Sequence, residues 1–334
     1  MHQLSRAPIA SWRRILPVAT ALVVALAIAG PAQAQTEVHV VVAFDESAGQ
    51  NPEGIAVDRV GNIYVSVSPL GDLWRIPPGS DEPQPFGHID GIVPGRDFGL
   101  LGLAVDVFGN IYGGVQSADP DVNGVWRFDR WTGDATRLPG TAQIVVPNGL
   151  AFDKQANLYV TDSVPGKIWR ITWGGSADLW LQDPVLTGDG SLGVFIGVNG
   201  IAVRHGVVLV TNTERHTELA IPKVGGQPGP ISVLASFPDG QTPDGLALDV
   251  HGNSFVALNT TNEIARVTPG GSVSDVASGD PLDFPSSVAF GAGRRPRMTL
   301  FGVNFSISEN LGFPPGEGPG VFRLDAGVPG WSLP

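Results

Sequence analysis

Apolar and small residues recur along this chain in one short phrase, and a turn and a second apolar run follow each copy. The copies are PEGIAVD at 52–58, LGLAVD at 101–106, PNGLAFD at 147–153, VNGIAV at 198–203, PDGLALD at 243–249 and a degenerate PSSVAF at 285–290. The runs that follow, such as IYVSV and LYVTDS, are rich in Val, Ile and Tyr and are bounded by Gly and Asn. This pattern is typical of β-strands, and nothing beyond residue 34 sustains a helical period. We therefore predict an all-β chain.

The spacing of the phrase, about 45 residues, indicates a repeat architecture. Each unit adds a third strand (73–76, 125–128, 168–171, 264–267 and 321–324) and, in most units, a weaker fourth strand. Four strands in each of six units predict a six-bladed β-propeller. A β-sandwich would not repeat at this spacing, and a solenoid would leave two ends to be capped. The sixth unit lacks a clear fourth strand, so we predict that the N-terminal strand 37–44 completes the last blade and closes the ring.

The first 34 residues have the features of an export signal. Arg6, Arg13 and Arg14 precede an apolar run that ends before Ala32-Gln33-Ala34, the order of a secretory signal peptide with a small-residue cleavage site. No later segment has the roughly 20 apolar residues of a membrane-spanning helix. We predict a signal peptide at 1–34, cleaved near Ala34, and a single propeller domain at 35–334 that is exported to the periplasm or the extracellular space.

The charge and the cysteine content of the chain exclude some partners and some kinds of catalysis. Three of the 20 Lys and Arg residues and none of the 32 Asp and Glu residues lie in the first 34 positions, which leaves a formal net charge of −15 on the remainder. Such a surface repels phosphate backbones, so nucleic acid is excluded as a partner, although the acidity also suits solubility alone. The chain has no Cys, which excludes thiol catalysis and cysteine-ligated metals.

One position of the phrase carries candidate metal ligands. The residue before the small position is Glu53, Asn148, Asn199 and Asp244 in four of the units, and Leu101 and Ser286 in the other two. In a propeller this position lies near the axis on one face, so the four oxygen-bearing side chains would converge. Two carboxylates and two amides suit a hard cation such as Ca²⁺ or another divalent ion, and the absence of His and Cys disfavours zinc or copper. The alternative is that Asn and Asp serve only as turn residues, a role that does not account for Glu53.

These phrases resemble those of the gluconolactonase/regucalcin family, whose wider relatives include diisopropyl fluorophosphatase and the paraoxonases. The resemblance implies a six-bladed propeller with a calcium ion in its central channel, held by Glu53, Asn148, Asn199 and Asp244 in the same blade order. It also implies that Asp244, the aspartate ligand, activates water or attacks the substrate. The sugar lactonases carry an Arg-x-Asn-Asp run entering the second blade, where this chain has GRDFG at 95–99. This departure weakens the case for a sugar-acid lactone.

Loop residues on the same face are candidates for the substrate pocket. His216 is the candidate auxiliary base, because histidine titrates near neutral pH. His88, Arg96 and Asp97 lie on the connection into the second blade, and Phe313 lies in a Gly- and Pro-rich stretch, 308–320, that could form a lid. Solvated surface histidines and an ordinary long connection are the alternatives.

The function that we predict is a calcium-dependent hydrolase of a lactone or related ester, acting as a monomer on a small molecule. A non-catalytic binding or scaffold propeller with a structural calcium ion is the alternative, because this architecture hosts both kinds of protein. A strictosidine-synthase-like condensing enzyme is disfavoured, because its relatives use a Glu and no metal.

Overall fold

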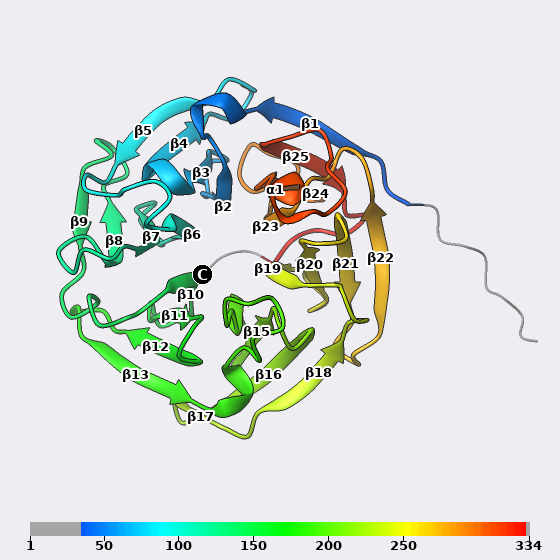
Figure 1. Cartoon of the computed structure of the whole chain (residues 1–334). Helices are drawn as coiled ribbons and strands as arrows, with labels where there is room; N and C mark the ends of the chain where they lie inside the picture. The colour runs from blue at the N-terminus through cyan, green and yellow to red at the C-terminus, as the bar shows by residue number, and fades with distance from the viewer. Residues whose placement is uncertain (1–34, 332–334) are drawn as a thin grey trace, which may run out of the picture. The chain divides into compact units, whose positions relative to one another are not determined.

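Each repeat forms one antiparallel sheet, and the six sheets surround a common axis as the blades of a propeller (Figure 1). The computed structural model describes residues 35–331. The predicted signal peptide, 1–34, and its cleavage site lie outside the described residues. The all-β, six-bladed prediction is confirmed.

The first three blades follow one another along the chain. Blade 1 contains β2 (Pro52–Val57), β3 (Ile63–Val67), β4 (Asp72–Ile76) and β5 (Gln84–His88); blade 2 contains β6 (Gly99–Val105), β7 (Ile111–Gln116), β8 (Gly124–Phe128) and β9 (Ala135–Arg137); blade 3 contains β10 (Pro147–Phe152), β11 (Leu158–Asp162), β12 (Lys167–Ile171) and β13 (Ala177–Gln182). In each blade the repeated phrase forms the innermost strand.

The remaining blades keep this order with two variations. Blade 4 contains β14 (Val198–Arg204), β15 (Val207–Asn212), β16 (Thr217–Val224) and β18 (Ser232–Ser236), with a short β17 (Gln227–Pro228) on the end of β16. Blade 5 contains β19 (Pro243–Leu248), β20 (Ser254–Leu258), β21 (Glu263–Val267) and β22 (Val273–Ser278). Blade 6 combines β23 (Pro285–Phe290), β24 (Thr299–Asn304) and β25 (Gly320–Asp325) with β1 (Val38–Ala43).

The N-terminal strand closes the ring, as predicted. Strand β1 pairs antiparallel with β25, with Val38 opposite Leu324 and Ala43 opposite Gly320. The last blade is therefore built from both ends of the described chain, which leaves no blade unpaired at the seam.

The core is divided into six layers, one between each pair of neighbouring blades. Tyr64 and Leu73 of blade 1, for example, pack against Leu100 and Phe128 of blade 2. Alternate residues of each strand face opposite sides of the sheet, so one blade contributes to two layers. Residues 35–331 therefore form no single central core, and a cavity remains on the axis.

The phrase ends in a turn that its last residue stabilises. Asp58 Oδ1 accepts hydrogen bonds from the backbone N–H groups of Val60, Gly61 and Asn62 at 2.8–2.9 Å. The side chain of Asn62 donates to the other carboxylate oxygen at 2.6 Å. Equivalent turns follow the innermost strands of blades 2, 3 and 5. These aspartates hold turns, and they lie at the opposite end of the innermost strand from Glu53.

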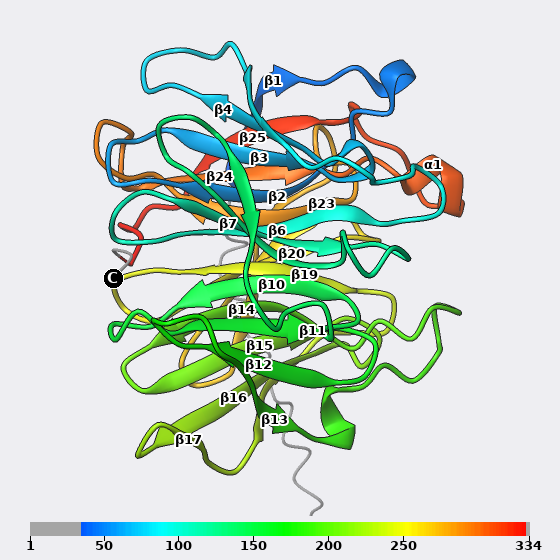
Figure 2. The same ribbon diagram turned by 90° about the vertical axis from the view of Figure 1, so that its left-hand side faces the viewer.

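The two faces of the propeller differ. We call the face at which the innermost strands begin the entry face, and the opposite one the exit face. Helices η1 (Glu46–Ala48), η2 (Ser68–Leu70), η3 (Pro184–Leu186) and α1 (Ser308–Leu311) lie in entry-face connections. Figure 2 shows α1 on one side of the blades and the segment that follows β25 on the other. Within residues 35–331, no helix has the length and hydropathy of a membrane span.

Candidate metal centre

A β-bulge interrupts every innermost strand at the same place. Pairing with the second strand shifts between Pro52 and Ile55 in blade 1, and at the corresponding residues of the other five blades. A bulge bends the strand and re-aims a side chain. The skipped positions include Glu53, Asn148, Asn199 and Asp244, so the bulge directs these four side chains out of the blades and toward the axis.

The four predicted ligands line one small cavity on the axis, which we call the ring cavity. Its volume is about 70 Å³, and its walls also include Ser286. The exposed fractions of Glu53, Asn148, Asn199 and Asp244 are 5–9%, so all four are buried. The structure thus brings together residues that are up to 191 positions apart in sequence. Their role as ligands stays a prediction.

A glycine follows each of the four predicted ligands, which we call the ring residues, and allows neighbouring blades to approach closely. A Cβ atom on Gly149 would lie 2.4 Å from the carbonyl oxygen of Asn199 in the next blade. The same contact is 2.3 Å for Gly200 with Asp244 and 2.5 Å for Gly54 with Leu101. Real Cβ atoms do not approach oxygen so closely, so glycine is required here for close packing of backbone.

Hydroxyl groups of the second strands hold the ring backbone in place. Thr161 Oγ1 accepts a hydrogen bond from the N–H of Gly149 at 2.8 Å and donates one to the carbonyl oxygen of Asn199 at 2.6 Å. Thr211 links Gly200 and Asp244 in the same way, and Ser66 links Gly54 and Leu101. Each hydroxyl therefore ties one blade to the next beside a ring position.

Sequence reasoning missed these hydroxyls. Their signal is a Ser or Thr at the fourth position of IYVSV, LYVTD and VLVTN.

Buried oxygen atoms without hydrogen-bond partners face this ring. The Oε2 atom of Glu53 and the Oδ1 atom of Asn199 are both buried and unpaired. The orientation of the Asn199 amide follows from its neighbour: Thr213 Oγ1 donates its proton to the Pro243 carbonyl at 2.9 Å, so it can only accept from Asn199 Nδ2, at 3.0 Å. The Asn199 oxygen is therefore the atom left without a partner.

Two buried carboxyl groups in one cavity disfavour each other's charge. Burial, and then the charge of Asp244, raise the pKa of Glu53 well above its ordinary value. Burial raises the pKa of Asp244 to about 7, and a hydrogen bond from Asn259 opposes this rise. Desolvation disfavours a lone carboxylate, whereas a cation nearby would favour it.

Asn259 positions the Asp244 carboxyl group. Its Nδ2 donates to Asp244 Oδ2 at 3.0 Å and to the Pro285 carbonyl at 2.9 Å, which joins blades 5 and 6. Asn259 was not among the site residues predicted from the sequence. The only signal was its place at the end of a second strand, in the run SFVALNT.

The donor set fits a hard divalent cation. All four ring residues offer oxygen, and two of them retain an unpaired buried oxygen, which is what an oxygen-liganded ion such as Ca²⁺ would satisfy. No group of three or more His, Cys, Asp or Glu side chains suited to a metal occurs between residues 35 and 331. The ring has two carboxylates only, so its amides would have to complete the shell.

His216 lies on the entry face, but its ring contacts backbone. It occupies the turn between β15 and β16 with a positive φ of 51°, and its Nδ1 lies 2.8 Å from the carbonyl oxygen of Gln241. A carbonyl only accepts, so Nδ1 carries the proton and Nε2 of the neutral ring is the free acceptor. His216 is not among the described residues that line the ring cavity.

The four residues expected around the substrate lie elsewhere, and none lines the ring cavity in the described part of the chain. His88 is half-exposed at the end of the outermost strand β5 and contacts Asp72 at 2.7 Å. The buried carboxylate of Asp97 is bound by Arg96 and by the N–H groups of Val93 and Ala118. These contacts, the Arg96 hydrogen bonds above all, hold the pKa of Asp97 well below its ordinary value.

Phe313 packs against Phe284 over blade 6, with 6.4 Å between ring centroids. Asp97 thus stabilises a loop, and a substrate role for His88, Arg96, Asp97 or Phe313 stays a prediction.

Comparison with known proteins agrees with this architecture. Residues 195–301 match the family model of the SMP-30/gluconolactonase/LRE-like region. No curated protein sequence matches the chain.

Three solved structures share the fold at low identity. A gluconolactonase from Xanthomonas campestris is 16% identical with a TM-score of 0.65, covering 87% of this chain and 89% of that one. A calcium-binding protein, regucalcin, from Agrobacterium tumefaciens is 16% identical with a TM-score of 0.62, covering 89% and 95%. A luciferin-regenerating enzyme is 14% identical with a TM-score of 0.61, covering 88% and 98%. The chain is a six-bladed propeller similar to gluconolactonase- and regucalcin-like proteins, and its residues 195–301 match their family model.

Proposed function

We propose that this protein is a calcium-dependent hydrolase of a lactone or related ester, with its site at the ring cavity. The observation that carries the proposal is the convergence of Glu53, Asn148, Asn199 and Asp244 around one buried cavity, with oxygen atoms of Glu53 and Asn199 unpaired. The similar structures from Xanthomonas campestris, a gluconolactonase, and Agrobacterium tumefaciens, a calcium-binding protein, support the same chemistry.

All four ring residues would bind the metal ion, and Asp244 would also transfer a proton. A calcium ion held by the four residues would polarise a carbonyl oxygen and offset developing negative charge. Asp244, oriented by Asn259, would take a proton from the attacking water, for which a pKa near the working pH is best suited. The Ser66, Thr161 and Thr211 hydroxyls would keep the ring backbone from widening when the cavity is filled.

Activity on a panel of lactones, with and without EGTA, tests this proposal. We expect hydrolysis that EGTA abolishes and calcium restores, and we expect Asp244→Asn to lower the rate by 100-fold or more, which is the size of a general-base effect. Glu218→Gln is the matched control, because Glu218 is another fully buried carboxyl and does not line the ring cavity. Full activity of Asp244→Asn, or of the chelated protein, would contradict the proposal.

A calcium-binding propeller without turnover is the second candidate. The observation that favours it is the small size of the ring cavity, about 70 Å³, together with the burial of all four ring residues. A melting temperature that rises with calcium, in a protein that hydrolyses no member of the panel, would support this candidate over the first.

A further inference from the structure

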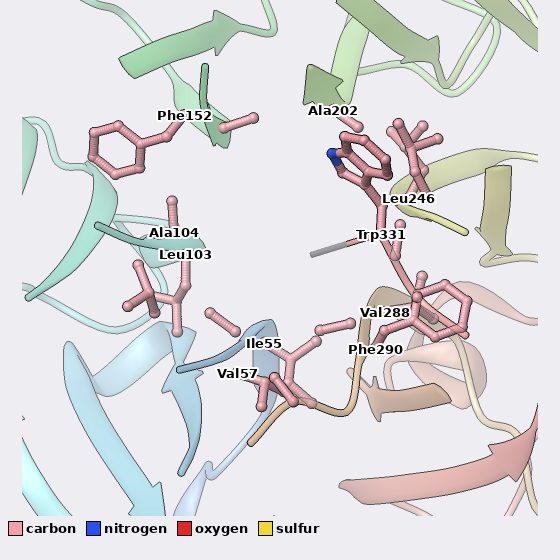
Figure 3. Close-up of a pocket in the computed structure, with 18 of the residues that line it drawn as sticks. Ile55, Val57, Leu103, Ala104, Phe152, Ala202, Leu246, Val288, Phe290 and Trp331 are labelled. Carbon is pink, nitrogen blue, oxygen red and sulfur yellow. The ribbon is translucent and has the colours of Figure 1, made fainter. Parts of the chain in front are cut away.

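A second and larger cavity occupies the exit-face half of the channel. We call it the exit chamber; its volume is about 570 Å³. Six apolar residues line both this chamber and the ring cavity and so form a collar between them: Ile55, Leu103, Leu150, Ile201, Leu246 and Val288. Figure 3 shows the apolar side chains around the chamber, with Phe152 and Leu103 across the opening from Trp331.

The C-terminal segment supplies one wall of this chamber. The N–H of Trp331 donates to the Leu248 carbonyl at 2.8 Å, and the N–H of Val250 donates to the Pro329 carbonyl at 3.0 Å. The N–H of Gly330 donates a hydrogen bond to the Arg297 carbonyl at 3.0 Å. These backbone hydrogen bonds hold Trp331 beside Leu248, at the apolar end of an innermost strand, so the indole forms part of the chamber wall.

Two arginines line the exit chamber, and two further basic side chains lie beside its Trp331 wall. Arg59 and Arg297 are the ionisable residues among its described lining residues, and both are exposed. Arg204 and Lys154 lie over the Trp331 ring at 4.5 and 5.3 Å from its centroid. This concentration of positive charge stands out in a chain whose formal net charge is −12.

No acidic residue is among the described residues that line the chamber. The turn aspartates Asp58, Asp106, Asp153 and Asp249 at the ends of the innermost strands are buried and accept hydrogen bonds from their own turns. Asp153 is also paired with Lys223 at 2.5 Å. The lining that a ligand would meet is therefore apolar inside and cationic at the rim.

We propose that the exit chamber binds an amphipathic carboxylate of the fatty-acid class, with its hydrocarbon part in the chamber and its carboxylate at Arg297. The volume is within the range of small-molecule sites, which is roughly 300–1,000 Å³. A neutral hydrocarbon would not use the arginines, and an inorganic anion would not use the apolar walls. The proposal does not depend on calcium, because the collar separates the chamber from the ring residues.

Calorimetric titration of the full chain in EGTA, with sodium hexanoate, octanoate and decanoate, tests the proposal. We expect the affinity to rise about fourfold per added methylene, which corresponds to about 0.8 kcal/mol for each buried group. Decanol, which has the same chain and no charge, should bind at least tenfold more weakly than decanoate. Equal binding of decanol, or no binding of decanoate, would overturn the proposal.

A charge-reversal pair locates the site. Arg297→Glu should weaken decanoate binding by tenfold or more. Arg323→Glu, an exposed change on β25 outside the chamber, should leave binding within twofold. Glu53→Gln should also leave it unchanged. Equal effects of the two arginine variants, or loss of binding in Glu53→Gln, would place decanoate elsewhere and refute the assignment.

Discussion

Replacing Asp244 with Asn is expected to stabilise the calcium-free protein and to remove the stabilisation that calcium provides. Burial raises the pKa of the Asp244 carboxyl to about 7 in the folded state, against an ordinary value of 3.8. The folded protein therefore holds more protons than the unfolded chain between about pH 4 and pH 7, and its stability falls as the pH rises through this window. Above pH 7 the buried charge disfavours folding, and Asn carries no charge.

The size of the effect follows from this pKa. At 1.36 kcal/mol per pH unit, a rise from 3.8 to about 7 corresponds to about 4 kcal/mol of unfolding free energy at pH 8. An unfolding entropy of about 2.1 cal/mol/K per residue gives roughly 0.6 kcal/mol/K for a domain of this length. The variant should therefore melt about 6 °C higher than the parent protein in EGTA.

Thermal unfolding at pH 8, in EGTA and in excess calcium, measures both parts of the prediction. The parent protein should gain about 2.7 kcal/mol, or roughly 4 °C, when calcium is present at 100 times its dissociation constant. Asp244→Asn should show no such gain.

Glu218→Gln is the control: burial also raises the pKa of Glu218 to about 7, and this residue lies outside the ring cavity. It should raise the melting temperature in both buffers and retain the calcium shift.

Two results would refute this reasoning. If Asp244→Asn melts at a lower temperature than the parent protein in EGTA, then burial of the Asp244 carboxylate does not destabilise the folded protein. If the variant keeps the full calcium shift while Glu218→Gln behaves as expected, then the calcium ion binds away from Asp244, and the candidate metal centre is wrong.

Three further predictions concern pH, packing and a buried ion pair. Calcium affinity, measured by calorimetry, should fall as the pH decreases from 8 to 6, because protons compete for two carboxyl groups whose pKa values are raised; an affinity independent of pH would contradict this. Gly149→Ala should lower the unfolding free energy by about 2 kcal/mol, because its Cβ would lie 2.4 Å from the backbone carbonyl oxygen of Asn199, whereas Gly270→Ala, whose Cβ would approach only Thr268 Oγ1 at an ordinary 3.8 Å, should not. Lys223→Met should destabilise by about 3 kcal/mol in urea unfolding, because it leaves the buried Asp153 carboxylate without its 2.5 Å partner. Asp153→Asn in the same background should restore part of this loss, and no rescue would show that the charge is not the cause.

The blades could be predicted because their strands alternate regularly and their turns carry Gly and Asn. Most of the predicted third strands agree with the structure to within a residue or two, as at 168–171 within β12. Blade 4 was harder, because its third strand, TELAIPKV, lacks the Arg that the third strands of the other five blades carry. The helix α1 lies inside the stretch expected as a lid, where a single helical turn has no detectable period.

The ring positions could be predicted because one repeated phrase places them at equivalent points of the blades. The contacts that orient them could not. The bulge at each position is a property of strand pairing, and Asn259 reaches Asp244 from just beyond the end of β20, beside the bulge in β19, which periodicity does not encode. The positions of Arg96 and Phe313 depend on the path of irregular chain, and His88 ends an outermost strand, β5, whose pattern is weak.

The shared last blade affects how this protein must be made. Strand β1 can pair only after β25 has been made, and β25 begins about 280 residues later. Closing a loop of that length costs about 5 kcal/mol of chain entropy. During synthesis, five blades can form an open arc that leaves the apolar faces of blades 1 and 5 uncovered where blade 6 would pack, a state prone to self-association. The final strand to emerge therefore completes the ring in one late step. A chain truncated before Gly320 would be an aggregation hazard, not a smaller working propeller.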